Sequence, residues 1–154
     1  VISKAVIEVF ALHFLQVPGV VFLSESKNKI VARDDDLAKS IGLRIEAQKN
    51  LPDIILADLG PKQPLLVFIE VVASDGPVSV ERKKALLLLA QEAGFPEGQV
   101  MFVTAYLDRS DAAFKKTVDS LAWGTFVWFA SEAEHLIRFY EGGPEAIRHL
   151  KNLR

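Results

Sequence analysis

The chain has 154 residues, half of them apolar and a quarter charged, and this length and composition suit one compact globular domain. It contains no cysteine, which excludes a disulfide scaffold and thiolate metal ligands and is consistent with the cytoplasm, and its apolar runs are too short to span a bilayer. The formal net charge of −2 lacks the basic excess usual in DNA-binding domains, so contact with DNA would depend on local clusters such as residues 82–84 and 115–116.

The first part of the chain is predicted to form a helix, a strand and a second, shorter helix. Apolar side chains recur at helical spacing over residues 4–16, and a Pro-Gly pair ends that helix. Residues 20–23 are β-branched and aromatic, which is typical of a strand, and a polar turn follows them. Asp34 or Asp35 can cap a short helix that reaches Ile41 and ends at Gly42.

Two apolar runs, residues 52–59 and 65–73, flank a loop of five residues that is rich in glycine and proline. Glycine and proline favour the dihedral angles that turns require. The pair is therefore predicted to be an antiparallel β-hairpin.

The rest of the chain alternates helices and strands. Ser79 can cap a helix over residues 80–93, which Gly94 closes. The elements expected after it are a strand over 100–107, a helix from 110 or 111 to 122, a strand over 124–130, a helix opened by the capping-box pair Ser131 and Glu134, and a last helix that starts at Pro144. This order favours an α/β fold with a mixed β-sheet flanked by helices, in which the early strands are antiparallel and helical crossovers join the later ones.

Glu70 is the most informative residue of the hairpin. It lies in a run that is apolar at both alternating sets of positions, so its strand is predicted to be central and covered on both faces. An ionised carboxylate buried there costs several kcal/mol unless a cation or hydrogen bonds compensate it. We therefore expect Glu70 to have a partner.

Asp53 is the nearest acidic candidate. If the hairpin turns around Lys62, Asp53 comes opposite about position 71, next to Glu70, whereas Asp58 lies nearer the tip. Two converging carboxylates repel each other, and Mg²⁺ would resolve that repulsion because it needs only one or two protein carboxylates besides water and substrate phosphate. From the spacing alone a structural interpretation is equally open, in which Asp53 begins a strand and Glu70 pairs with a buried arginine or lysine.

Other polar residues are weaker candidates. Glu8, in the first helix, could lend a third acid but is more typical of a surface glutamate, and Asp75 is more typical of a turn than of a second metal ligand. The three histidines, His13, His135 and His149, show no ligand spacing.

Several stretches of the chain resemble the C-terminal domain of the BsuBI/PstI type II restriction endonucleases, over roughly residues 42–137. They are LPDIILADLG, FIEVVASDGPVSVERKKAL, GFPEGQVMFVTAYLDR and LAWGTFVWFASEAEHLI. The resemblance implies a restriction-endonuclease-like PD-(D/E)xK core and Mg²⁺-dependent cleavage of double-stranded DNA at a short palindrome such as CTGCAG. It also implies a homodimer and an N-terminal domain that is absent here, which agrees with a chain that begins at Val1.

Carried over residue by residue, the resemblance makes Asp53 and Glu70 the metal-binding acids. The pattern expects a lysine two residues after the strand acid, where this chain has Val72. Some PD-(D/E)xK enzymes carry this lysine on the following helix, whose first turn here contains Arg82, Lys83 and Lys84. We predict Lys83 as the catalytic cation, with Lys84 second, although the trio could simply be a solvated helix face.

Two alternatives remain open at this point. Val72 favours a PD-(D/E)xK-fold domain that binds DNA or a protein partner without cutting it. A receiver-like α/β module, with Asp53 or Asp58 at a strand end binding Mg²⁺ and phosphate, would instead require a regular parallel sheet.

Overall fold

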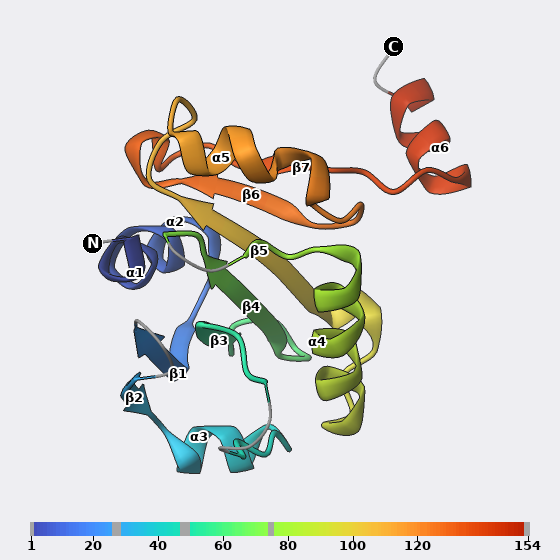
Figure 1. Cartoon of the computed structure of the whole chain (residues 1–154). Coiled ribbons are helices and arrows are strands. Elements are labelled where there is room, and N and C mark those ends of the chain that lie inside the picture. The colour runs from blue at the N-terminus through green and yellow to red at the C-terminus, as the bar shows by residue number, and fades with distance from the viewer. Residues whose placement is uncertain (1, 26–28, 47–49, 74–75, 153–154) are drawn as a thin grey trace.

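The computed structural model describes residues 2–25, 29–46, 50–73 and 76–152, and the described residues form one seven-stranded sheet (Figure 1). Its strand order is β2-β1-β3-β4-β5-β6-β7. The strands are β1 (Pro18–Glu25), β2 (Lys29–Arg33), β3 (Ile54–Asp58), β4 (Leu65–Val71), β5 (Val100–Tyr106), β6 (Phe126–Phe129) and β7 (Ile137–Arg138).

The pairing divides the sheet into an antiparallel and a parallel part. Strands β2, β1, β3 and β4 are antiparallel neighbours, β4 to β6 pair in parallel, and β7 returns antiparallel to β6. The predicted mixed sheet is thereby confirmed. The antiparallel β3–β4 hairpin contradicts the receiver-like alternative, which needs a regular parallel sheet.

Helices cover both faces of the sheet. One face carries a helical segment made of α1 (Ile2–Ala5), a π-helical turn η1 (Val6–Phe10) and α2 (Ala11–Phe14), whose buried Phe10 packs edge to face against Trp128 of β6. The other face carries α3 (Asp35–Ser40) and α4 (Val80–Glu92), and beside them α5 (Ala112–Thr117). The last helix, α6 (Pro144–Asn152), stands apart from this body in Figure 1.

The helix ends that the sequence predicts are confirmed for α3 and α4. The Asp34 carboxylate accepts the Leu37 N–H at 2.9 Å, and the Ser79 hydroxyl accepts the Arg82 N–H at 3.2 Å. Gly42 and Gly94 follow these helices with φ of +83° and +88°, a left-handed conformation that glycine adopts without strain. The start of α6 at Pro144 is confirmed as well.

Some predicted elements are wrong. The capping-box pattern at Ser131 and Glu134 opens no long helix: a 3₁₀ turn (Ala130–Glu132) leads into β7. Tertiary contacts override the pattern, because the Ser131 N–H bonds to the Leu107 carbonyl and Glu132 is paired with Arg109. The helix predicted over 110–122 is only α5 followed by a 3₁₀ turn (Val118–Ser120).

The sequence also failed to predict β2, whose residues are all exposed. As an edge strand β2 lacks the apolar alternation on which strand prediction depends. The first helix begins and ends two residues earlier than predicted and contains the π-helical turn. Among the described residues, no helix is both long enough and apolar enough to cross a membrane.

Candidate metal centre at the β3–β4 hairpin

The β3–β4 hairpin brings Asp53 and Glu70 side by side. Ile54 pairs with Ile69 and the register continues to Asp58 and Leu65, so Asp53, immediately before β3, comes beside Glu70. The Asp53 backbone N–H donates to Glu70 Oε1 at 3.2 Å. The Val71 N–H donates to Asp53 Oδ2 at 2.7 Å. The adjacency is therefore as predicted, with the register one residue from the predicted one.

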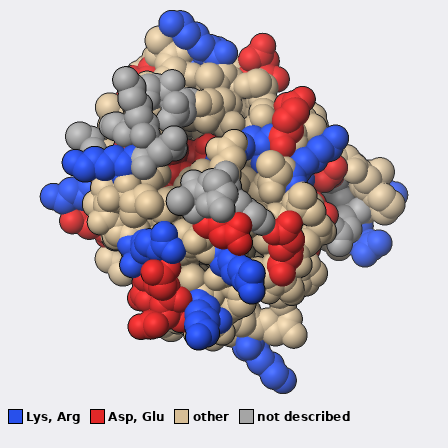
Figure 2. All heavy atoms as spheres, turned by 60° about the horizontal axis from the view of Figure 1, so that its bottom comes forward, with Lys and Arg blue, Asp and Glu red and all other residues tan. Residues whose placement is uncertain are grey.

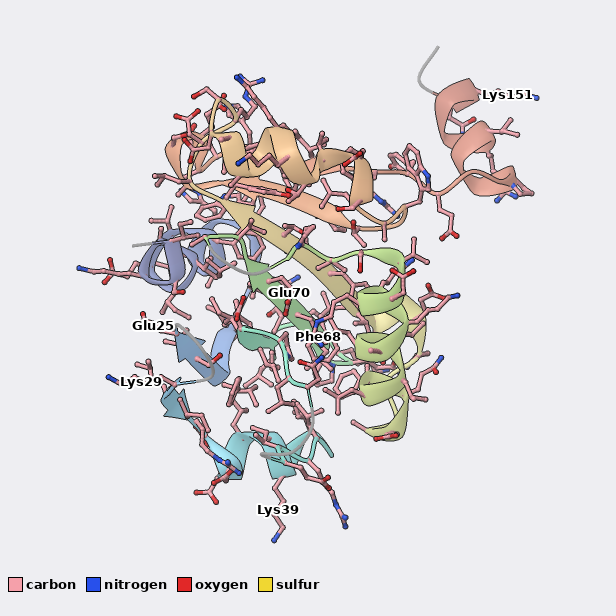
Figure 3. All side chains as sticks on the ribbon, viewed as in Figure 1. Glu25, Lys29, Lys39, Phe68, Glu70 and Lys151 are labelled. Atoms are coloured by element: carbon pink, nitrogen blue, oxygen red, sulfur yellow. The ribbon has the colours of Figure 1, made fainter. Side chains whose placement is uncertain are left out.

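Glu70 is a buried acid, with 6% of its surface exposed. It lies on the side of β4 that faces α4, two residues after Phe68 (Figure 3). Burial raises the pKa of Glu70 from about 4.5 to about 7; the Arg82 guanidinium lowers this pKa and the Asp53 carboxylate raises it. The unfavourable effects of burial and of Asp53 outweigh Arg82, so the pair of acids favours a further positive charge.

Arg82, in the first turn of α4, is a basic residue that contacts Glu70. Its Nη2 lies 3.3 Å from Glu70 Oε1 and its Nε lies 3.4 Å from Oε2. Nη1 and Nη2 also donate to the carbonyls of Asn50 and Leu51, at 2.9 and 2.8 Å. The structure thus contains the buried acid–arginine pair that the sequence left open.

Lys83, the predicted catalytic cation, points elsewhere. Its Nζ donates to the Trp123 carbonyl at 3.1 Å and lies 3.6 and 3.8 Å from the carboxylates of Glu97 and Glu141. The structure therefore does not bring Lys83 to Glu70, and Lys84 is exposed.

Helical spacing could have set Lys84 apart from the other two basic residues. Arg82 shares its helix face with Leu86 and Leu89, which are buried against the sheet. Lys84 is off that face, whereas Lys83, three residues before Leu86 and seven before the buried Ala90, is on its border and has a side chain only 15% exposed, as Arg82 has. An inward-facing position in the first turn of α4 was thus a signal for Arg82, but it did not exclude Lys83.

Val72 lies in an apolar cluster on the same side of the sheet. It is 5% exposed and packs with Tyr106, Val127 and Phe129. The position where the PD-(D/E)xK pattern has a lysine is thus part of a hydrophobic core in this chain.

The donor set fits Mg²⁺. Among the described residues no group of three or more His, Cys, Asp or Glu could hold a metal ion, but Mg²⁺ takes one or two protein carboxylates and completes its octahedron with water and substrate oxygens. Asp53 and Glu70 are such a pair. A bound cation would also offset the burial and the Asp53 charge, which together raise the pKa of Glu70.

Asp58 belongs to the fold and not to this pair. Its carboxylate accepts the backbone N–H groups of Gln16, Val17 and Gly60 at 3.0, 2.9 and 3.0 Å. Burial raises the pKa of Asp58, but these hydrogen bonds outweigh burial and leave it below the usual value. The carboxylate ties the end of the first helical segment to the hairpin.

The remaining candidates give no further ligand among the described residues. Glu8 is exposed and lies 3.9 Å from Lys4, as expected of a surface glutamate. Asp75 and the side chain of His149 lie outside the described residues. Basic and acidic side chains are interspersed on the face shown in Figure 2, with no continuous basic surface.

The sequence matches a family model, the BsuBI/PstI restriction endonuclease domain, over residues 1–142. The chain belongs to this family. It is 31% identical over 136 residues to the type II restriction enzyme BsuBI of Bacillus subtilis, covering 88% of this chain and 41% of that enzyme. It is 26% identical to the type II restriction enzyme AplI of Arthrospira platensis over 90% of this chain and 43% of the relative.

A solved structure agrees with the family assignment. The fold is similar to that of the SdaI restriction endonuclease, with a TM-score of 0.76 and 27% sequence identity over 92% of this chain and 43% of that one. The predicted restriction-endonuclease-like fold is thereby confirmed. The chain spans about two fifths of the length of each of these relatives.

Proposed function

We propose that the chain carries the catalytic centre of a type II site-specific deoxyribonuclease, which hydrolyses phosphodiester bonds of double-stranded DNA with Mg²⁺ at a short palindrome similar to CTGCAG. The observation that carries the proposal is the buried Glu70 beside Asp53, in a chain of this family. In a protein interior, two adjacent acids of which one is buried are unfavourable unless a cation or hydrogen bonds compensate them, and such acids are concentrated at functional sites.

Asp53 and Glu70 are the proposed metal ligands. The Val71 N–H fixes Asp53 Oδ2, and the Asp53 N–H fixes Glu70 Oε1, so each ligand is oriented by the backbone of the other strand. Bound Mg²⁺ would supply Lewis-acid polarisation of a phosphoryl oxygen and a more acidic water. The apolar surroundings of Glu70 strengthen every electrostatic contact made there.

Lys83 remains a candidate for the catalytic cation only if its ion pairs with Glu97 and Glu141 open. Those contacts support a structural role for it instead, because they join α4 to the segments before β5 and after β7.

The proposal extends to the assembly. Cleavage of both strands of a palindrome requires two sites related by two-fold symmetry, so we expect a homodimer. The relatives match over about two fifths of their length, which supports a further domain in the intact protein, and by resemblance to the family we expect that domain at the N-terminus. We expect the protein in the cytoplasm, where its DNA substrate would be present, and the lack of cysteine is consistent with that location.

A domain of this fold that binds DNA or a protein partner without cleaving it is the second candidate. Val72 favours it, because the pattern lysine is replaced by a residue of the apolar core.

Cleavage of supercoiled plasmid by the intact protein with Mg²⁺ tests the proposal. We expect discrete fragments from the wild type and a loss of at least about a hundredfold in Asp53→Ala and in Glu70→Ala, since even residues that only orient metal ligands contribute 10–100-fold. Lys83→Ala and Lys84→Ala, measured in the same assay, test whether either lysine is the catalytic cation. An intact plasmid would favour the non-cutting candidate, and acid variants that cut as well as the wild type would rule out Asp53 and Glu70 as the metal ligands.

A further inference from the structure

The guanidinium of Arg82 is almost fully committed to contacts within the protein. Four of its N–H groups donate to Glu70 Oε1, Glu70 Oε2, and the carbonyls of Asn50 and Leu51, out of the five that an arginine has. The side chain is 15% exposed. A guanidinium used in this way has little capacity left for a substrate phosphate.

These contacts join three separate parts of the chain. Arg82 belongs to α4, Glu70 to β4, and Asn50 and Leu51 to the segment that leads into Asp53. Glu70 Oε1 accepts from both the Arg82 guanidinium and the Asp53 N–H. The arginine therefore fixes the orientation of one acid and the path of the backbone that carries the other.

We infer that Arg82 is a positioning residue, which supports the two acids from the first turn of α4. It orients Glu70 and Asp53 toward one metal ion and does not itself contact the DNA. The inference rests on the proposed function of these two acids as metal ligands.

A residue that orients the ligands and a residue that only carries a positive charge affect metal affinity in opposite ways. A cation close to the ligands repels Mg²⁺, so removing a mere charge would tighten metal binding. Removing a residue that orients the ligands weakens it, typically by 10–100-fold. A lysine at position 82 would keep the charge, but its single nitrogen cannot reproduce the planar fork that reaches a carboxylate and two carbonyls.

The test is isothermal titration of Mn²⁺ into the intact protein without DNA. We expect Arg82→Ala and Arg82→Lys each to bind Mn²⁺ about 10–100-fold more weakly than the wild type. Arg33→Ala is the matched control, because Arg33 also bonds a carboxylate and a backbone carbonyl, those of Asp35 and Ile45, on the edge strand β2. The control should bind Mn²⁺ as the wild type does.

A second readout needs no metal. Hydrogen exchange of the Asp53 and Val71 amides, which bond to Glu70 and Asp53, should accelerate in the Arg82 variants and stay unchanged in Arg33→Ala. If Arg82→Ala does not fold, Arg82→Lys, which keeps the stem and the charge, decides the question.

The outcomes separate this inference from the proposed function. Wild-type Mn²⁺ affinity in Asp53→Ala and Glu70→Ala would overturn the metal site itself. If the acid variants lose Mn²⁺ binding but both Arg82 variants bind Mn²⁺ as tightly as the wild type or more tightly, only the positioning role is overturned. Arg82 would then act on the two acids through its charge alone.

Discussion

Glu70 is a buried acid beside a second acid, and Arg82 compensates the two charges only in part. Its place in a run that is apolar on both sides predicted burial, and the structure confirms it. The hairpin register predicted Asp53 beside it. The sequence could not predict which cation would compensate Glu70, because that depends on how α4 is rotated about its axis over the sheet.

The ionisation of Glu70 should make the stability of the metal-free protein depend on pH. Its folded pKa of about 7 lies above the ordinary value of 4.5, so its stabilising contribution is complete below pH 4.5 and is lost as the pH rises through 7. Glu70→Gln mimics the neutral acid. We expect the variant to unfold at the same urea concentration as the wild type near pH 4.5 and to be more stable by up to about 3 kcal/mol above pH 8.

Urea denaturation in a chelator at both pH values measures this difference. Glu134→Gln, which changes an exposed glutamate, should match the wild type throughout. If Glu70→Gln differs from the wild type in free energy of unfolding by the same amount at both pH values, the charge of Glu70 is not the cause of the difference.

Asp58 should behave in the opposite way, because its role is structural. Asp58→Ala removes the acceptor of three backbone N–H groups, and we expect a loss of about 2–4 kcal/mol in the free energy of unfolding with Mn²⁺ affinity retained. Since the folded pKa of Asp58 is lowered, its contribution is present above the ordinary value of 3.8 and is lost as the pH falls below it. Unchanged stability with lost Mn²⁺ binding would instead make Asp58 a ligand.

Among the elements, those with strong local signals were predictable. The β3–β4 hairpin has a Gly-Pro loop between two apolar runs, and α4 has a serine cap and a closing glycine; the structure confirms both. The exposed edge strand β2 has no such signal. The capping-box pattern at Ser131 is a local signal that longer-range contacts override, which one sequence cannot show.

The cap of α4 can be tested directly. Ser79→Ala removes the hydroxyl that accepts the Arg82 N–H, and we expect it to lower the free energy of unfolding by about 1 kcal/mol. Ser120→Ala, which removes an exposed hydroxyl bonded to the Thr117 carbonyl, is the control and should cost less. Thermal unfolding measures both, and an equal Tm for Ser79→Ala and the wild type would contradict the assigned cap.

For the whole molecule, the order of elements predicted a mixed sheet but not its full width or the position of its edges. The last segment runs from β7 to α6, a helix that stands apart from the body (Figure 1). The sequence predicts where this helix starts, at Pro144, but not the path of the segment. Such features depend on packing between elements that no local pattern encodes.

Metal binding should be visible as a change in global stability. Any ligand that binds only the folded state raises stability, by about 2.7 kcal/mol at a concentration of 100 times Kd. We expect Mn²⁺ to raise the Tm of the wild type in calorimetry and to leave that of Glu70→Gln unchanged. An equal rise in both proteins would place the ion elsewhere.

The closeness of the three central residues along the chain has a consequence for folding kinetics. Glu70 is separated by 17 residues from Asp53 and by 12 from Arg82, whereas the parallel pairs β4–β5 and β5–β6 each require a long crossover. Contacts with short sequence separation close with the least loss of chain entropy and so tend to form early. The two acids would then meet in a nascent hairpin before the parallel half of the sheet assembles, which makes α4, with Arg82 in its first turn, the element whose docking completes the centre.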